Sequence, residues 1–459
     1  MDAATHLPLQ NDVKSPSSPT ATTPAAPASR IGERLRSLRL AAGLTQTQVA
    51  GDRFSKEYIS QIERGKTRPT QETIVWLAGR LSVDANFLAS GVSNDQRARA
   101  ETILTRAEAL VERRDYDAAV EEYANARTAI VSAGAVELHV RALSGDAWAR
   151  AHRGDVRQAI ALLGEARGLA EGQQFSDIDR AELLFRLGVA RYLIASISTA
   201  VALLGEALVL VEGSPLPSDL LRANILTWRS RCYRRQRDFE AARDDVERAL
   251  ELAEAMQDTK ALGEAYFQAS LIAERDGHWV LARTYAEKAK AQYEELTDRT
   301  NIGRLLNNLG GLEFLLGKPE QAITRLHEAF GVVLEHGNDD DIATVVSSLA
   351  QVHLKTGDPV KAEEHARHAL ARLGTRENKL DEIGNARLVL GRALLDQDRL
   401  DEAEVALAEA EDALSQLSSA SHRAAAWVAQ GDLAQRRGED RVSAAHYRRA
   451  AEALQDFRF

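Results

Sequence analysis

Polar side chains of the kinds that read DNA bases gather in one stretch of the sequence, LTQTQVAGDRFSKEYISQIERGKTRP, from Leu44 to Pro69. Lysine donates to the O6 and N7 atoms of guanine, glutamine pairs in both directions with adenine, and glutamate accepts from the amino group of cytosine. Ile59 and Ile62 lie three residues apart and predict the inward face of a short helix. The residues left toward solvent or DNA are Lys56, Glu57, Ser60 and Gln61.

Capping residues are expected to fix the helices that position this face. Thr45 and Gln48 have the spacing of a capping box. Leu44 and Val49 stand at the two positions of a hydrophobic staple, so the start of a short helix is set twice. Ser55 is expected to cap the next helix. The sequence therefore predicts two short helices joined by a turn.

Three further helices are expected to complete a small domain. Gly43 ends the first helix, Thr70 follows Pro69 at the start of the fourth, and Asp84 caps the fifth. The apolar positions that these helices turn inward are Leu35, Leu38 and Ala42 in the first, Ile74, Leu77, Ala78 and Leu81 in the fourth, and Phe87 and Leu88 in the fifth.

These motifs resemble the helix-turn-helix domain of the phage-repressor (Xre) family. The resemblance covers roughly residues 31–90 and rests on LTQTQVA, SKEYISQIERGKTRP and the amphipathic helix that follows. It implies a five-helix, lambda-repressor-like domain over residues 30–92 that lays its third helix in the major groove of double-stranded DNA. It also implies base-contacting roles for Gln46, Lys56, Glu57 and Gln61. The positions that it implies for phosphate contacts, which position the domain rather than specify a sequence, are Tyr58, Lys66, Thr67 and Arg68.

The turn before the third helix departs from the phage repressors. Between Ala50 and Ile59 it is one residue shorter, and Phe54 is expected to fill the apolar position before the Ser55 cap. The tilt of the third helix on DNA is therefore left open.

Beyond this domain the chain repeats with a period of 40–42 residues. The copies align on an alanine at the end of segments such as RDYDAAVEEYANA and GKPEQAITRLHEA. A second alanine lies seven residues earlier in each copy, except that Ser443 takes this place in the last, and a small residue lies further upstream, as in LVLGRALL. The aligned alanines are Ala126, Ala166, Ala207, Ala249, Ala289, Ala329, Ala369, Ala410 and Ala450.

The pattern resembles the tetratricopeptide repeat (TPR), stretched from its usual length of about 34 residues. The resemblance implies a right-handed, TPR-like α-solenoid of about nine helical hairpins over residues 93–459, which makes the whole chain all-α. The alternative is an unrelated α-solenoid, whose function would differ little.

A TPR solenoid lines a concave groove with the first helix of each hairpin, and such a groove holds an extended peptide or a partner helix. Asparagine can donate to and accept from a peptide backbone at once, and arginine can grip a carboxylate with two bonds. These side chains could instead be solvated, and Asn308 could pack its own hairpin. The TPR register places at or near the groove Arg186, Asn224, Arg231, Arg234, Gln268, Arg304, Asn307, Asn308, Gln351, Asn385 and Arg392.

Charge is unevenly spread along the 459 residues. The formal net charge is −10, yet residues 30–92 hold 10 Lys and Arg against 6 Asp and Glu. An acidic chain argues against non-specific coating of nucleic acid, whereas a basic end suits local contact with phosphates.

The termini and composition favour a cytoplasmic protein. Residues 1–29 are rich in Pro, Ser, Thr and Ala and predict a disordered tail. A signal-peptide pattern and a membrane-spanning apolar run are both missing from the sequence. The single cysteine, Cys232, excludes an internal disulfide and is interpreted as a small core residue.

Catalytic and metal-binding interpretations are weak. GGLEFLLGKP has five residues between Gly311 and Gly317, where a phosphate loop has four, and Pro319 stands where Ser or Thr would hold magnesium. His365 and His368 lack a third ligand at helical spacing, which favours a solvated face. No enzymatic activity, cofactor or metal is expected.

The order of the two parts resembles the RRNPP group of peptide-responsive regulators. This architectural resemblance implies a sequence-specific transcriptional regulator whose TPR solenoid binds a peptide or protein effector. A single reading domain binds weakly, so a homodimer on a palindromic operator is expected. The alternative is a TPR interaction scaffold that a small helix-turn-helix module tethers to DNA or to partners.

Overall fold

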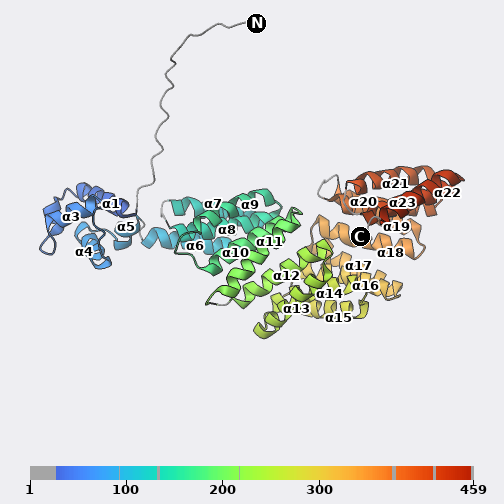
Figure 1. Ribbon diagram of the computed structural model, residues 1–459, viewed down its shortest axis with the longest axis horizontal. Helices are drawn as coiled ribbons and strands as arrows, with labels where there is room; N and C mark the ends of the chain where they lie inside the picture. The colour runs from blue at the N-terminus through green and yellow to red at the C-terminus, as the bar shows by residue number, and fades with distance from the viewer. Residues whose placement is uncertain are drawn as a thin grey trace, which may run out of the picture. The chain divides into compact units, whose positions relative to one another are not determined.

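The computed structural model describes residues 27–91, 94–131, 135–216, 218–374, 379–416 and 420–455. The elements in these ranges are α-helices (Figure 1), so the all-α prediction is confirmed for them. The predicted tail lies outside the described residues up to residue 26, and helix α1 already begins at Pro27.

Two compact units divide the chain. One ends at Leu169 and the other begins at Ala170. The boundary expected near residue 93, between the small domain and the repeats, falls inside the first unit and stays a prediction.

The small domain in the first unit has the five expected helices. They are α1 (Pro27–Ala41), α2 (Gln46–Ala50), α3 (Lys56–Glu63), α4 (Gln71–Leu81) and α5 (Ala85–Ser90). Leu35 and Leu88 are each 1% exposed and belong to one apolar core with Val49 and Leu77. Ala42 was expected to face this core, but it is exposed because α1 ends one residue earlier.

The remaining helices of both units pair into hairpins, nine within the described residues, so the predicted solenoid is confirmed. The first unit pairs α6 (Asn94–Glu112) with α7 (Tyr116–Val131) and α8 (Val136–Arg153) with α9 (Val156–Leu169). The second unit pairs α10 (Asp177–Leu193) with α11 (Ile197–Gly213), α12 (Asp219–Gln236) with α13 (Phe239–Met256), α14 (Thr259–Arg275) with α15 (Trp279–Glu295), α16 (Arg299–Leu315) with α17 (Pro319–His336), α18 (Asp339–Lys355) with α19 (Pro359–Leu373), α20 (Leu380–Asp396) with α21 (Leu400–Ser415), and α22 (Ala420–Arg436) with α23 (Asp440–Gln455).

The repeated small residues lie where the helices of a hairpin approach each other. The aligned alanines fall on the second helices and are 0% exposed, apart from Ala450 at 3%. A Cβ atom on Gly310 of α16 would lie 2.7 Å from Cγ of Leu326 on α17. A larger side chain at such a position would force the two helices apart. Small residues therefore recur once per hairpin, wherever its two helices touch.

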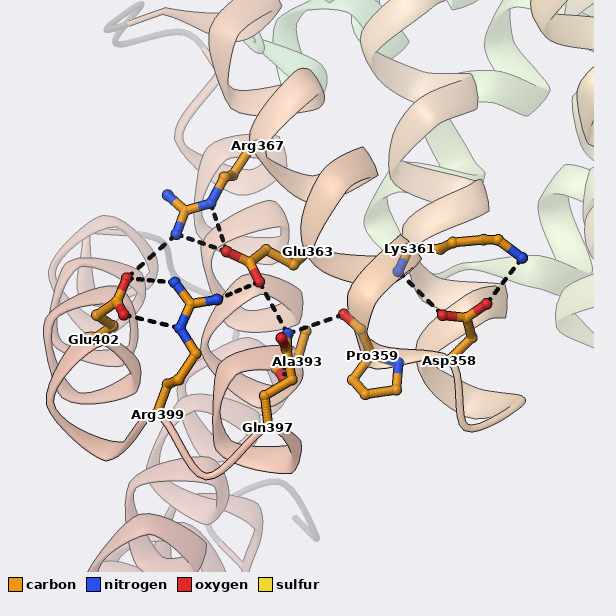
Figure 2. A network of polar contacts seen from close by, with 9 residues as sticks. All are labelled: Asp358, Pro359, Lys361, Glu363, Arg367, Ala393, Gln397, Arg399 and Glu402. Carbon is orange, nitrogen blue, oxygen red and sulfur yellow. Dashed lines mark hydrogen bonds and ion pairs between the residues drawn. The ribbon is translucent and has the colours of Figure 1, made fainter.

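Polar networks join successive hairpins at their ends, and Figure 2 shows one between α19, α20 and α21. The Glu363 carboxylate of α19 accepts bonds from Arg367 at 2.9 Å, from Gln397 at 2.9 Å and from Arg399 at 2.6 Å. Arg399 also donates two bonds to Glu402 on α21. Because Gln397 and Arg399 come from the turn between α20 and α21, the network fixes one hairpin against the preceding one.

Cys232 of α12 is fully buried, and burial raises the pKa of its thiol to about 11. A thiol of this kind is an unreactive core residue, as the sequence indicated. Among the helices that the structure describes, none combines the length and the apolar character needed to cross a bilayer.

Candidate DNA-reading face and effector groove

The caps that were expected to place the reading helix are present. Thr45 Oγ1 accepts from the Gln48 amide at 3.2 Å and the Gln48 side chain accepts from the Thr45 amide at 2.8 Å, which completes the capping box of α2. Ser55 Oγ accepts from the Tyr58 amide at 3.1 Å at the start of α3. The caps thus fix the start of α2 at Gln46 and the start of α3 at Lys56.

Helix α3 has one buried and one exposed face. Ile59 and Ile62 are 0% exposed, whereas Lys56, Glu57 and Gln61 lie exposed on the opposite side. The exposed side therefore presents a cation, an anion and an amide, three groups able to hydrogen-bond base edges.

A buried ion pair, which sequence reasoning missed, supports Gln46. Glu63 at the end of α3 accepts from Arg39 Nε at 2.6 Å and from Arg39 Nη2 at 3.1 Å. The same carboxylate accepts from Gln46 Nε2 at 2.8 Å. The two charged side chains are 11% and 4% exposed, and the hydrogen bond to Glu63 raises the pKa of Arg39. Gln46 is therefore held by a bond inside the domain, with its carbonyl oxygen left for other partners.

The remaining candidate side chains of this domain differ in how far contacts within the domain hold them. Gln61 accepts a hydrogen bond from Thr67 at 3.0 Å, which ties α3 to the following loop. The Tyr58 ring packs 5.2 Å from the Phe54 ring, and Phe54 in turn meets Trp76 edge-on, so Phe54 fills the apolar position expected of it. Lys66 and Arg68 are not buried, as phosphate-contacting residues must be accessible.

A hollow of about 620 Å³ opens between the end of α1 and the starts of α2 and α3. Gln46 and Lys56 both line it, so the structure brings together two of the residues predicted to contact bases. Arg39, the partner of Glu63, lines the same hollow. The contacts of these residues with DNA stay predictions.

The eleven residues predicted for the effector groove all lie on the first helix of a hairpin. Along the second unit each first helix contacts the next, from α10 and α12 through to α20 and α22, and the contact of α14 with α16 is made by side-chain hydrogen bonds. The residues are distributed as Arg186 on α10, Asn224, Arg231 and Arg234 on α12, Gln268 on α14, Arg304, Asn307 and Asn308 on α16, Gln351 on α18, and Asn385 and Arg392 on α20.

Two cavities of about 450 Å³ each lie on these helices and include six of the eleven residues. The first cavity, on α14, α16 and α18, includes Arg304, Asn307 and Asn308, with Phe267 and Leu271 as apolar lining. The second, on α18, α20 and α22, is lined by Gln351, Asn385 and Arg392 beside Lys355, Asp396 and Asp432. Volumes of this order suit small ligands or short peptide segments.

Several groove residues bond to neighbouring repeats. Arg304 donates to Asp341 of α18 at 2.7 Å and 3.3 Å. Asn308 accepts from Ser270 at 3.0 Å and donates to Glu274 at 3.1 Å, so it joins α14 and α16 while it also lines the first cavity. Asn308 therefore joins neighbouring repeats, which is the alternative role considered for it, and it also lines the first cavity.

Other groove residues keep a buried polar atom without a partner. Within the described residues, hydrogen-bond partners are missing at Nε of Arg231, Arg234 and Arg392, at Oε1 of Gln268 and at Oδ1 of Asn307. Unsatisfied buried polar atoms are rare in folded proteins because each costs about 1–3 kcal/mol. These five atoms lie on the first, or inner, helices of their hairpins.

The histidines that were expected on a solvated face are partly buried and pack against rings of neighbouring helices. The His365 ring of α19 stacks at 5.5 Å on His353 of α18, and His368 meets Phe330 edge-on at 6.0 Å. Burial lowers the pKa of both His353 and His365. Across the described ranges, no group of three or more His, Cys, Asp or Glu side chains could hold a metal ion.

Comparisons with protein families divide the chain in the same way. A helix-turn-helix domain model matches residues 30–86. Tetratricopeptide-repeat models match residues 223–256 and 301–374. The two predicted kinds of domain are therefore both recognised, each in its expected part of the chain.

One curated relative is the HTH-type transcriptional regulator DdrOP3 of Deinococcus deserti. It is 39% identical over 74 residues, which are 16% of this chain and 57% of that protein. The chain thus covers little more than half of its relative, and the likeness is confined to one short segment.

Solved structures share the fold of the repeats at low sequence identity. Rap protein complexed with Competence and Sporulation Factor is 15% identical, with a TM-score of 0.55 over 78% of this chain and 98% of Rap. A signal transduction ATPase of Pyrococcus horikoshii with a tetratricopeptide repeat sensor is 14% identical, with a TM-score of 0.55 over 93% of this chain and 62% of the other. From its fold and these comparisons, the chain joins a helix-turn-helix domain to a helical solenoid that contains tetratricopeptide repeats.

Proposed function

We propose that this chain is a sequence-specific, DNA-binding transcriptional regulator whose TPR solenoid binds a peptide or protein effector. One observation carries the proposal: α3 buries Ile59 and Ile62 and exposes Lys56, Glu57 and Gln61 along its opposite face. A short capped helix with such a face is the element that enters the major groove in helix-turn-helix proteins. The kinship of one segment with a transcriptional regulator supports the same function.

The regulator acts as a cytoplasmic homodimer on a palindromic operator. Each good base contact contributes about 1–3 kcal/mol, so the few contacts of one α3 give weak binding. Two copies related by a two-fold axis double these contacts and fix the spacing of the half-sites. Tyr58, Lys66, Thr67 and Arg68 hold the phosphates on either side and set the register rather than the sequence.

The solenoid supplies the regulation. Its two cavities and its unpartnered polar atoms support an effector site on the inner helices. Rap, which shares the repeat fold, is complexed with Competence and Sporulation Factor in its structure. An effector that binds one arrangement of the repeats better than another shifts the equilibrium between them, with a coupling of about 1–3 kcal/mol to DNA binding.

The test begins with selection of DNA from a random duplex pool by the full-length protein, followed by fluorescence anisotropy on the enriched sequence. Lys56→Ala and Gln61→Ala should each weaken binding by about 1–3 kcal/mol and relax selection at one base position. Lys260→Ala, which removes an exposed cation from α14, should leave the sequence preference unchanged.

Either of two results would reject sequence-specific regulation. One is a pool with no enriched sequence, and the other is equal binding of the enriched sequence by Lys56→Ala, Gln61→Ala and the wild type. Partner capture that is equally strong with and without DNA would then favour the interaction scaffold.

A further inference from the structure

Four arginines form a cluster on α12 and α14 whose charge is not balanced by nearby acids. The arginine cluster consists of Arg231, Arg234, Arg235 and Arg275, and the charges of the other three act on Arg234. Two carboxylates lie close to it: Glu264 is 3.6 Å from Arg231, and Glu274 interacts with Arg234 and Arg275. Four cations thus face two anions.

Arg234 is the least compensated member. Burial, followed by the charges of the other arginines, lowers the pKa of its guanidinium. Among the described residues no carboxylate forms an ion pair with Arg234, and the Nε atoms of Arg231 and Arg234 are both buried without a hydrogen-bond partner. A partly buried cation of this kind is costly unless an anion completes it.

Aromatic rings hold two of the cations in place. The Arg231 guanidinium lies 4.3 Å from the centre of the Trp228 ring, and that of Arg235 lies 5.1 Å from the centre of the Tyr192 ring. The two rings meet edge-on at 5.6 Å. A guanidinium stacked on a ring keeps its in-plane N–H donors available for a carboxylate, so the stacking preorders the cluster.

The arginine cluster adjoins the first cavity. Glu274 lines this cavity and lies close enough to Arg234 and Arg275 for their charges to affect its carboxyl group. Burial raises the pKa of Glu274, against the opposing effects of Arg275, Asn308 and Arg234. The unpartnered amide oxygens of Gln268 and Asn307 belong to the neighbouring helices α14 and α16.

We propose that the effector is a peptide that bears a carboxylate and seats it on Arg231 and Arg234 at the edge of the first cavity. This inference rests on the proposed function and adds the charge and the seat of its ligand. Two partly buried guanidiniums bind a carboxylate with short, charge-assisted bonds. The neighbouring amides and the apolar Phe267 and Leu271 suit a peptide backbone and its side chains.

The carboxylate has two possible sources, an acidic side chain or the free C-terminus of the peptide. A synthetic library of random heptapeptides, made once as free acids and once as C-terminal amides, distinguishes them. The full-length protein retains binders from each library, and mass spectrometry reads their sequences. Isothermal titration then measures the best binder against the wild type, Arg234→Gln and the Arg231→Gln/Arg234→Gln double variant.

Retained peptides should carry Asp or Glu at a fixed position in both libraries, or should come from the free-acid library alone. Arg234→Gln should weaken binding at least tenfold, and the double variant more. Arg248→Gln is the matched control, because Arg248 lies on α13 with a half-exposed side chain and pairs with Glu212. It should bind like the wild type, and melting curves should show all variants folded.

The possible failures are separable. If neutral or basic peptides are retained from both libraries, the inference is overturned while the proposed function stands, and this result needs the wild type alone. Equal binding by Arg234→Gln and the wild type would overturn it as well. If neither library yields a binder, the peptide effector of the proposed function falls, and the carboxylate seat falls with it.

Discussion

The two candidate functional regions treat their polar side chains in opposite ways. On the DNA-reading face, Gln46 is bonded to Glu63, Glu63 to Arg39, and Gln61 to Thr67. On the inner helices of the solenoid, Gln268 and Asn307 keep buried oxygens without partners in the described structure. The helix-turn-helix domain, called the reader below, is therefore ordered by its own hydrogen bonds. The candidate groove instead keeps polar atoms that the fold of the described residues does not bond.

The difference has an energetic meaning. A preordered face loses little conformational entropy when it meets DNA. Unpartnered atoms in a groove reduce stability, and a ligand that supplies the missing bonds recovers the loss as binding energy. Stability of the solenoid comes instead from small residues packed between the helices of each hairpin, as at Ala289 and Gly310.

The largest expected effect is on the reader. Glu63→Ala would leave Arg39 buried without its counter-charge, and breaking a buried pair in this way costs about 3–5 kcal/mol. Hydrogen exchange over residues 27–91 should show that domain unfolded while the repeats stay protected. The exposed pair of Arg53 and Glu72 provides the control, since Glu72→Gln should cost less than about 1 kcal/mol. Unchanged protection in Glu63→Ala would mean that the reader is not held by its internal bonds.

The next effect concerns packing in the solenoid, and two adjacent glycines of α16 give a matched pair. Gly310→Ala places a Cβ 2.7 Å from Leu326 Cγ and should destabilise the repeats by about 1–3 kcal/mol. A Cβ on Gly311 would meet nothing within 4 Å, so Gly311→Ala should stabilise α16 by about 0.5–1 kcal/mol. Urea unfolding measures both changes, and equal signs for the two variants would disprove the close approach.

A third variant tests the polar network of Figure 2. Burial disfavours the charge of Glu363, but bonds from Gln397 and Arg367 and the charge of Arg399 outweigh it and lower the pKa. Glu363→Gln should therefore cost about 1–2 kcal/mol at neutral pH. Because the folded pKa lies below the ordinary value of 4.5, this stabilisation is present above pH 4.5 and is lost as the pH falls through the folded pKa.

Unfolding free energies of the wild type and Glu363→Gln at pH 7, 5 and 4 test this dependence. Their difference should be constant between pH 7 and 5 and should shrink below that range. Glu402→Gln, at an exposed carboxylate in the same network, should have the smaller effect. A difference that grows on acidification would contradict the network.

The smallest effect concerns a buried amide beside the first cavity. Gln268 is 4% exposed with an unpartnered oxygen, so Gln268→Met should raise the free energy of unfolding by about 1 kcal/mol and weaken effector binding. Gln397→Met is the contrasting control, because its amide donates to Glu363 and to the Pro359 carbonyl. If Gln268→Met is destabilised as much as Gln397→Met, the Gln268 amide is hydrogen-bonded within the fold. The contrast between the groove and the helix-turn-helix domain would then be wrong.

Much of the fold was predictable because it depends on local or periodic signals. The capping box at Thr45 and the cap at Ser55 act within three residues, and the repeat of alanines marks each second helix. Gly43 ends α1 as predicted, but the prediction that Ala42 faces the core was wrong, because Ala42 lies exposed in the turn after the helix. The prediction for the histidines of α19 was wrong because their partners His353 and Phe330 lie on other helices.

The sequence by itself determined the two kinds of domain, the capped helix α3 and the first helices of the hairpins, since each follows from spacing along one chain segment. Only the tertiary structure decided which polar groups are satisfied. Glu63 and Arg39 meet across 24 positions, and Arg234 lies partly buried near other arginines without a carboxylate partner in the described residues. Pairing between helices depends on distances in space, which sequence periodicity does not encode.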